Sequence, residues 1–142
     1  MAAVSPRRRA CAIGAWSLVV TGVVHAAAVA AGAGETDSPV ERLADTHLVI
    51  AGLDRSLWQL FTGFSLAMAL FIVGLGALNL LVLRRAPELF LDGRAVIVLN
   101  LGIVVPALAL SVLFFPPPPI VLLGVGGVAF GYALVARSSA AR

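Results

Sequence analysis

The stretch that decides the fold is SLWQLFTGFSLAMALFIVGLGALNLLVLRR, which runs from Ser56 to Arg85. Between Leu60 and Leu83 it contains no charged residue, and it ends on the pair Arg84–Arg85. A helix rises about 1.5 Å per residue, so this stretch is long enough to cross a hydrocarbon core of about 30 Å. Trp58 lies near the opposite end, where tryptophan favours the interface between water and lipid. The stretch therefore predicts a membrane-spanning helix.

The composition of the whole chain agrees with a membrane protein. Of its 142 residues, 61% are hydrophobic and 12% are charged, whereas soluble domains carry about 25% charged residues. The net charge of +3 comes from arginines beside the apolar runs, which is not the continuous basic face of a nucleic-acid-binding protein. The lipid bilayer is therefore the expected partner, and no nucleic acid is expected. All ten basic residues are arginine, a bias that favours a GC-rich bacterial genome.

Three further apolar runs predict an all-α fold, a four-helix transmembrane bundle in a single integral membrane domain. The expected spans are residues 10–33, 57–83, 94–115 and 120–136. Pro106 predicts a kink in the third span, and Pro116 to Pro119 predict a stiff extended turn before the fourth. A secretory signal peptide is the alternative for the first run, because Ala31-Gly32-Ala33 resembles a cleavage site. The length of the run favours an uncleaved helix.

Residues 34–56 form the one long polar segment of the sequence and predict a short extracytoplasmic amphipathic helix between the first two spans. Ser38 is suited to be its N-cap, with proline next and Glu41 in the third position. Apolar residues from Val40 to Ala51 then follow at helical spacing, although Leu48 to Leu53 would also suit a brief strand. Asp54 and Asp92 are expected to cap the second and third spanning helices.

The arginines predict how the chain is threaded. Eight of the ten fall in the N-terminal arm, the 84–94 loop and the C-terminal tail, which share one side if there are four spans. The positive-inside rule then predicts that both termini lie in the cytoplasm. For a bacterial multi-pass protein, the expected location is the plasma (inner) membrane.

His25 is the first candidate for a ligand site. An ionisable residue inside a spanning helix is costly and usually faces the protein interior or water. It would relay protons, ligate haem or a metal, or bond a quinone-like headgroup. The alternative is a structural histidine that hydrogen-bonds across the bundle or lies near the outer interface. Thr21, which lies one helical turn before His25, and the membrane residues Asn79 and Asn100 are further candidates for ligand binding. His47, with Asp45 and Glu41 nearby, does not have the spacing of a metal site, and no metal is expected. Cys11 is expected to be a small apolar residue at a helix end.

Asn79 and Asn100 are placed to meet near the cytoplasmic ends of the second and third helices, where an interhelical amide bond stabilises a bundle. Hydroxyl side chains such as Thr62 and Ser111 are expected to bond within their own helices. Gly74, Gly76, Gly127 and Gly131 are expected to allow close helix packing, either within this chain or in a homodimer.

Two fragments carry a resemblance. Thr21-Gly22 with His25 in the first helix, and Leu57-Trp58 followed by Gly63-Phe64-Ser65 in the second, resemble small uncharacterised four-helix bacterial integral membrane proteins. The architecture is also similar to that of DoxX-like proteins. The resemblance implies the fold and carries no assigned activity.

No catalytic motif is present in the sequence, so the leading hypothesis is a non-enzymatic accessory or structural subunit. It would bind a lipid or a membrane-protein partner, and its cofactor, if any, is unknown. The alternative is a haem- or quinone-binding redox bundle that uses His25. A small four-helix transporter ranks third, because no carboxylate lies inside any expected span.

Overall fold

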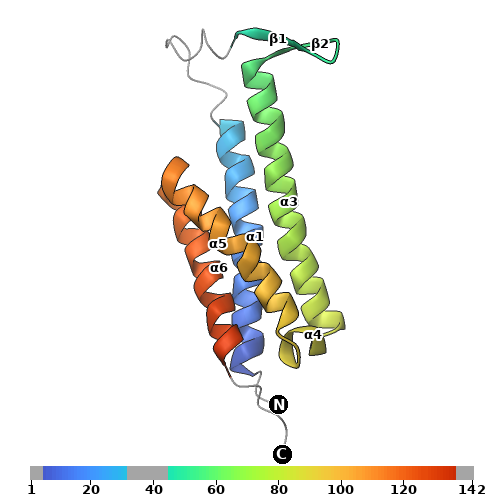
Figure 1. Cartoon of the computed structure of the whole chain (residues 1–142), viewed down its shortest axis with the longest axis vertical. Helices are drawn as coiled ribbons and strands as arrows, with labels where there is room; N and C mark the ends of the chain where they lie inside the picture. The colour runs from blue at the N-terminus through green and yellow to red at the C-terminus, as the bar shows by residue number, and fades with distance from the viewer. Residues whose placement is uncertain (1–4, 32–44, 137–142) are drawn as a thin grey trace, which may run out of the picture.

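The chain forms four long helices and one small hairpin, as seen in a computed structural model that describes residues 5–31 and 45–136 (Figure 1). The elements in chain order are α1 (Pro6–Ala31), β1 (His47–Ile50), β2 (Leu53–Ser56), α3 (Leu57–Arg85), α4 (Glu88–Leu91), α5 (Ala95–Phe114) and α6 (Pro117–Val135).

Helices α1, α3, α5 and α6 are each long and apolar enough to cross a membrane. Their lengths of 26, 29, 20 and 19 residues meet the requirement of about 20 residues for a hydrocarbon core. The structure therefore confirms four candidate spans, as expected for a multi-pass membrane protein. Most of their large side chains are exposed, among them Phe64, Phe71 and Leu113, as lipid-facing positions would be.

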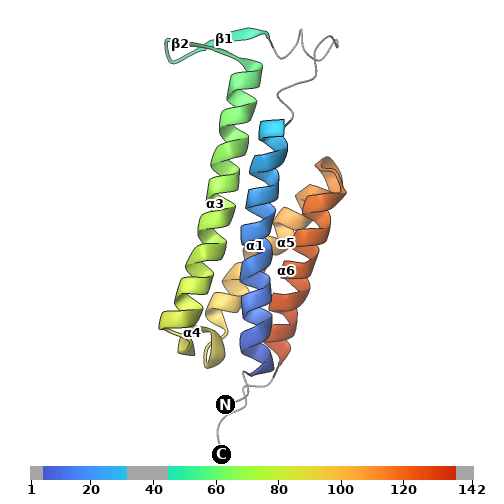
Figure 2. The same ribbon diagram turned by 180° about the vertical axis from the view of Figure 1, so that it is seen from behind.

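Helix α1 lies at the centre of the assembly. It packs against α3 on one side and α6 on the other, and α5 packs against α6. Figures 1 and 2 show that α5 runs at an angle across α1: it begins beside the α4 end of α3 and finishes beside the start of α6. Helices α3 and α5 are therefore close at the α4 end and diverge toward the hairpin.

Glycine allows α1 and α3 to approach closely. A Cβ on Gly22 of α1 would lie 2.6 Å from Val73 Cγ2 and 2.7 Å from the Ala69 carbonyl oxygen on α3. Reciprocally, a Cβ on Gly76 of α3 would lie 2.8 Å from the Ala15 carbonyl oxygen on α1. These distances are too short for any side chain, so the two backbones meet where one helix supplies glycine and the other a small residue.

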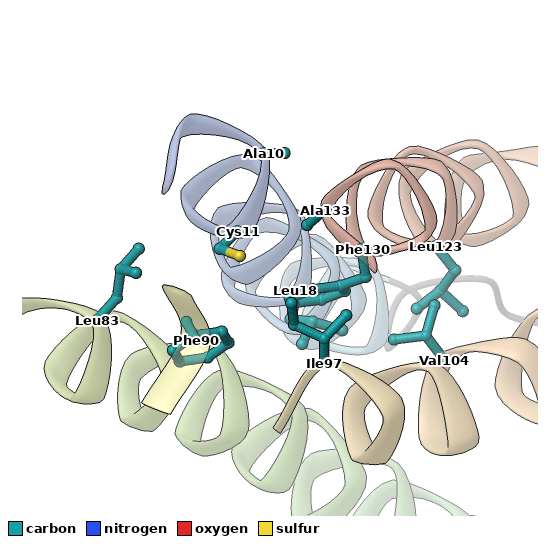
Figure 3. Close-up of a cluster of buried hydrophobic side chains, with 10 residues drawn as sticks. All are labelled: Ala10, Cys11, Leu18, Leu83, Phe90, Ile97, Val104, Leu123, Phe130 and Ala133. Atoms are coloured by element: carbon teal, nitrogen blue, oxygen red, sulfur yellow. The ribbon is translucent and has the colours of Figure 1, made fainter. Parts of the chain in front are cut away.

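A hydrophobic core fills the space between α1, α5 and α6 and continues to α4 (Figure 3). Leu18, Ile97 and Phe130 point into the centre of this space, and Phe90 of α4 closes its end. Gly14 makes room for the Phe130 ring, since a Cβ there would lie 2.7 Å from Cε2 of that ring.

The segment before α3 corrects the prediction of an amphipathic helix. Residues His47 to Ser56 form an antiparallel β-hairpin, in which His47 pairs with Ser56 and Ile50 with Leu53. The turn between the strands uses positive φ at Ala51 and Gly52, a geometry that glycine favours. Extended structure, the alternative to a helix here, is therefore present, but as two paired strands and not as one strand from Leu48 to Leu53. Residues 38–44 of the predicted helix lie outside the described residues.

The caps of α3 and α5 and the start of α6 also differ from the prediction. Ser56, not Asp54, caps α3: its hydroxyl accepts from the Gln59 amide, and the Gln59 side chain accepts from the Ser56 amide. Arg94, not Asp92, is the N-cap residue of α5, without a side-chain cap. Pro116 to Pro119 do not form the predicted extended turn, because α6 already begins at Pro117. Proline fits the first turn of a helix, where its missing N–H has no intrahelical partner.

The two ends of the molecule carry different chemistry. The start of α1, the end of α6 and α4 lie at one end, and the hairpin lies at the other (Figure 1). Arg7, Arg8, Arg9, Arg84, Arg85 and Arg94 all belong to the first end by their positions in the helices. Arg7 is buried there and donates from Nη2 to the Gly93 carbonyl oxygen at 2.7 Å, which ties α1 to the α4–α5 loop.

Candidate ligand site at His25

A small cavity lies where α3 and α5 diverge, and all four long helices contribute to it. Its volume is about 120 Å³. The lining is almost entirely apolar and consists of Thr21, His25, Met68, Ile72, Ala107, Leu110, Ser111, Phe115, Pro119 and Leu123.

His25 supplies the nitrogen of this cavity. Its Nε2 atom is buried and has no hydrogen-bond partner among the described residues. The Phe115 ring stands edge-on to the imidazole, with 6.4 Å between the ring centroids and 81° between the planes. The imidazole is therefore held by apolar contacts on a lining that offers Nε2 no partner.

The two hydroxyl groups of the lining are already engaged as donors. Thr21 Oγ1 donates to the Ser17 carbonyl oxygen at 2.7 Å, and Ser111 Oγ donates to the Ala107 carbonyl oxygen at 2.8 Å. Both bonds stay within one helix, as predicted for such residues. Thr62 departs from that prediction, because its buried Oγ1 has no partner in the described chain.

Of the polar groups on this largely apolar lining, His25 Nε2 is the one without a partner among the residues that the structure describes, because both hydroxyls donate within their own helices. A buried nitrogen without a partner costs about 1–3 kcal/mol, and a guest with a carbonyl or hydroxyl group would recover that cost. A neutral imidazole can donate from one nitrogen and accept at the other, so Nε2 suits either kind of group. The cavity is smaller than the 300–1,000 Å³ typical of sites that enclose a whole small molecule. Its volume suits a ring or a headgroup rather than a whole lipid-like molecule.

The second histidine does not share this site. His47 belongs to the hairpin, where its Nδ1 lies 2.8 Å from Asp54 Oδ1 and both side chains are exposed. His25 instead faces Met68, which lies about three turns into α3. Within residues 5–31 and 45–136, no group of three or more His, Cys, Asp or Glu side chains is placed to hold a metal ion.

Asn79 and Asn100 meet as the sequence predicts, away from the cavity. Asn79 Nδ2 donates to Asn100 Oδ1 at 2.6 Å, and Asn100 Nδ2 donates to Asn79 Oδ1 at 3.0 Å. Both side chains are buried. Asn100 also donates to the Val96 carbonyl oxygen at 2.8 Å. The amide pair thus joins α3 to α5 at the end where these helices are close, which leaves no free donor at Asn100 for a ligand.

Among the glycines that the sequence suggested for helix packing, Gly76 makes a tight contact within the chain, whereas Gly74, Gly127 and Gly131 do not. A Cβ on Gly74 or Gly131 would meet nothing within 4 Å, and one on Gly127 would lie 3.7 Å from Val104 Cγ1, an ordinary contact. The close approaches inside the chain belong to Gly14, Gly22, Gly76 and Gly126. Packing of Gly74 and Gly131 against a second copy stays a prediction.

The sequence singled out His25 and Thr21 of this lining but not the apolar residues around them. Met68, Leu110 and Phe115 are ordinary apolar residues in spanning helices, and no local pattern marks them as a lining. The signal that would have indicated Phe115 is its position just before the proline run that turns α5 into α6. Comparisons with protein families, with curated proteins and with solved structures found no match to this chain.

Proposed function

We propose that this protein is a non-enzymatic accessory protein of the bacterial inner membrane that binds a lipid-like molecule at His25. The headgroup of that molecule would occupy the cavity and hydrogen-bond to Nε2, and its apolar tail would lie between α3 and α5. The observation that carries the proposal is the buried Nε2 without a partner on an apolar lining.

The free-energy cost of leaving His25 Nε2 without a hydrogen bond favours a bound molecule in the cavity. A water could bond only Nε2 and the lone pairs of the two lining hydroxyls, whose protons are donated within their own helices, and it would gain little from the apolar remainder of the lining. A molecule with one polar group and a large apolar part satisfies the nitrogen and fills the space at once.

The distribution of arginines supports the proposed orientation. The end that carries Arg7, Arg84 and Arg94 would face the cytoplasm, together with both termini, and the hairpin would lie outside. His25 is six residues before Ala31, the end of α1 nearer the hairpin. The proposed ligand would therefore enter from the outer leaflet.

A quinone is the second candidate for the guest. The cavity size suits one ring, and the edge-on Phe115 leaves an apolar wall beside the nitrogen that would bond a quinone carbonyl. In that case the protein would hold or deliver a redox carrier. Haem is less well supported, because His47, the other histidine of the chain, is engaged with Asp54 in the hairpin.

Native mass spectrometry of protein purified from its own membranes in mild detergent tests the proposal. We expect a defined non-protein mass on the wild type and on His47→Ala, and its loss on His25→Ala. A mass that matches a prenylated quinone would select the second candidate. The same adduct at the same occupancy on His25→Ala, or a wild-type chain with no adduct, would overturn the proposal.

A further inference from the structure

The β1–β2 hairpin has two chemically different faces. Its register places His47, Val49 and Asp54 on one face, and Leu48, Ile50, Leu53 and Arg55 on the other. The first face carries the exposed His47–Asp54 pair. The second is apolar apart from one arginine, and its leucines and isoleucine are all exposed. An isolated two-stranded hairpin is only marginally stable in water, so a second contact surface is expected.

The apolar face overhangs the outer side of α3. Ile50, Leu53 and Arg55 line a groove of about 890 Å³ whose other wall is the first three turns of α3, including Gln59, Gly63 and Phe64. Figure 1 shows the hairpin extending sideways from the start of α3, away from α1. A Cβ on Gly63 would meet nothing within 4 Å, so the floor of the groove is open along the helix. Phe64 is 76% exposed beside it.

The groove combines this apolar floor with one positive charge at its mouth. Arg55 donates from Nη1 to the Asp54 carbonyl oxygen at 2.8 Å. The Asp54 carboxylate is on the opposite face, where it bonds His47, and no described carboxylate pairs with Arg55. The guanidinium therefore keeps its charge and its remaining donors for an anion.

The neighbouring aromatic residues place the groove at the level of lipid headgroups. Trp58 and Phe61 stack in the first turns of α3, with 6.0 Å between their rings and 29° between the planes. Tryptophan is enriched at membrane interfaces because one part of its ring is apolar and one part polar. Arg55 lies at this level or just outside it, where phosphates are found.

We propose that the hairpin is a membrane-surface flap that holds one phospholipid of the adjacent leaflet. The phosphate would bond the Arg55 guanidinium, and an acyl chain would run under Leu53 and along Gly63 and Phe64. Charge complementarity at the mouth favours a phospholipid over an apolar protein segment. This site is separate from the His25 cavity and does not depend on the function proposed above.

A matched pair of labelled variants tests the flap. In a Cys11→Ala background, Leu53→Cys and Val49→Cys place a fluorescent label on opposite faces of the hairpin, at positions that are both exposed. The protein is placed in nanodiscs of phosphatidylcholine and phosphatidylglycerol that carry nitroxide-labelled lipid. We expect the label at position 53 to be quenched by the nitroxide and protected from iodide, and the label at position 49 to behave oppositely. Equal iodide quenching at both positions would overturn the proposal.

The charge is tested separately by native mass spectrometry with phosphatidylglycerol. We expect Arg55→Gln to weaken binding about fivefold, the effect of one basic side chain at an anionic surface, and Arg55→Lys to retain most of it. Arg94→Gln, at the other end of the molecule, is the control for non-specific loss of charge. An equal loss in Arg55→Gln and Arg94→Gln, or none in either, would contradict the phosphate site.

Discussion

Asn79 and Asn100 show how two polar residues can hold two spanning helices together. Each side chain satisfies the other, and the pair is buried between α3 and α5. We expect Asn79→Ala and Asn100→Ala each to lower the free energy of unfolding by about 1–3 kcal/mol, because each leaves a buried amide without its partner. In a double-mutant cycle the coupling should be about 0.6–1.7 kcal/mol, measured by unfolding in mixed detergent micelles. Strictly additive effects would show that the two amides do not interact.

Single residues could be predicted from the sequence where the residue itself is unusual in its local stretch of chain. His25 and the asparagines stand out in the sequence because they are polar in apolar runs, and the asparagine pairing followed from their shared depth. The lining of the His25 cavity comes from four helices far apart in the chain. That lining depends on the tilt of α5, which a single run of apolar residues does not reveal.

Gly74 and Gly76 lie on the same helix, α3, but substitution by alanine should change the stability of the protein in opposite directions. Gly76→Ala places a Cβ 2.7 Å from Val19 Cγ2 and 2.8 Å from the Ala15 carbonyl oxygen. We expect it to lower stability by about 1–3 kcal/mol through overpacking. Gly74→Ala enters open space and should leave stability unchanged or raise it by up to about 1 kcal/mol. Thermal unfolding of the two variants in the same detergent measures the difference, and equal effects would refute the close α1–α3 contact.

The start of α3 is expected to depend on Ser56. Ser56→Ala removes the hydroxyl that accepts from the Gln59 amide and should weaken the helix start by about 1 kcal/mol. Amide hydrogen exchange at Gln59 should then be about fivefold faster, whereas Asp54→Ala, the residue that the sequence suggested as the cap, should leave it unchanged. A larger effect of Asp54→Ala would favour the original assignment.

The elements that the sequence predicted well are those with long, uniform patterns. All four helices follow from apolar runs, because a chain in lipid must satisfy its backbone hydrogen bonds internally. The hairpin did not follow, because His47, Ile50 and Ala51 continue the helical spacing of the residues before them, while the run from Leu48 to Leu53 also suits a strand. The apolar side chains of this segment are exposed and do not pack against a protein core, so burial in a core could not distinguish a helix from a strand here.

The proposed orientation of the whole molecule predicts that a reagent outside the cell reaches the hairpin end but not the arginine-rich end. In a Cys11→Ser background, Val49→Cys on the hairpin should react with a membrane-impermeant maleimide in intact cells. Glu88→Cys, which is exposed on α4 at the arginine-rich end, should react only after the cells are opened. Labelling of Glu88→Cys in intact cells would reverse the assigned orientation.

The central claim is that His25 Nε2 binds the polar group of a lipid-like guest. The chain has two histidines, so His47→Gln leaves one imidazole whose ¹⁵N resonances belong to His25. We predict that adding the lipid fraction extracted from purified wild-type protein to delipidated His47→Gln shifts the Nε2 resonance to a hydrogen-bonded position. An Nε2 resonance that does not move on addition of that fraction would contradict the account.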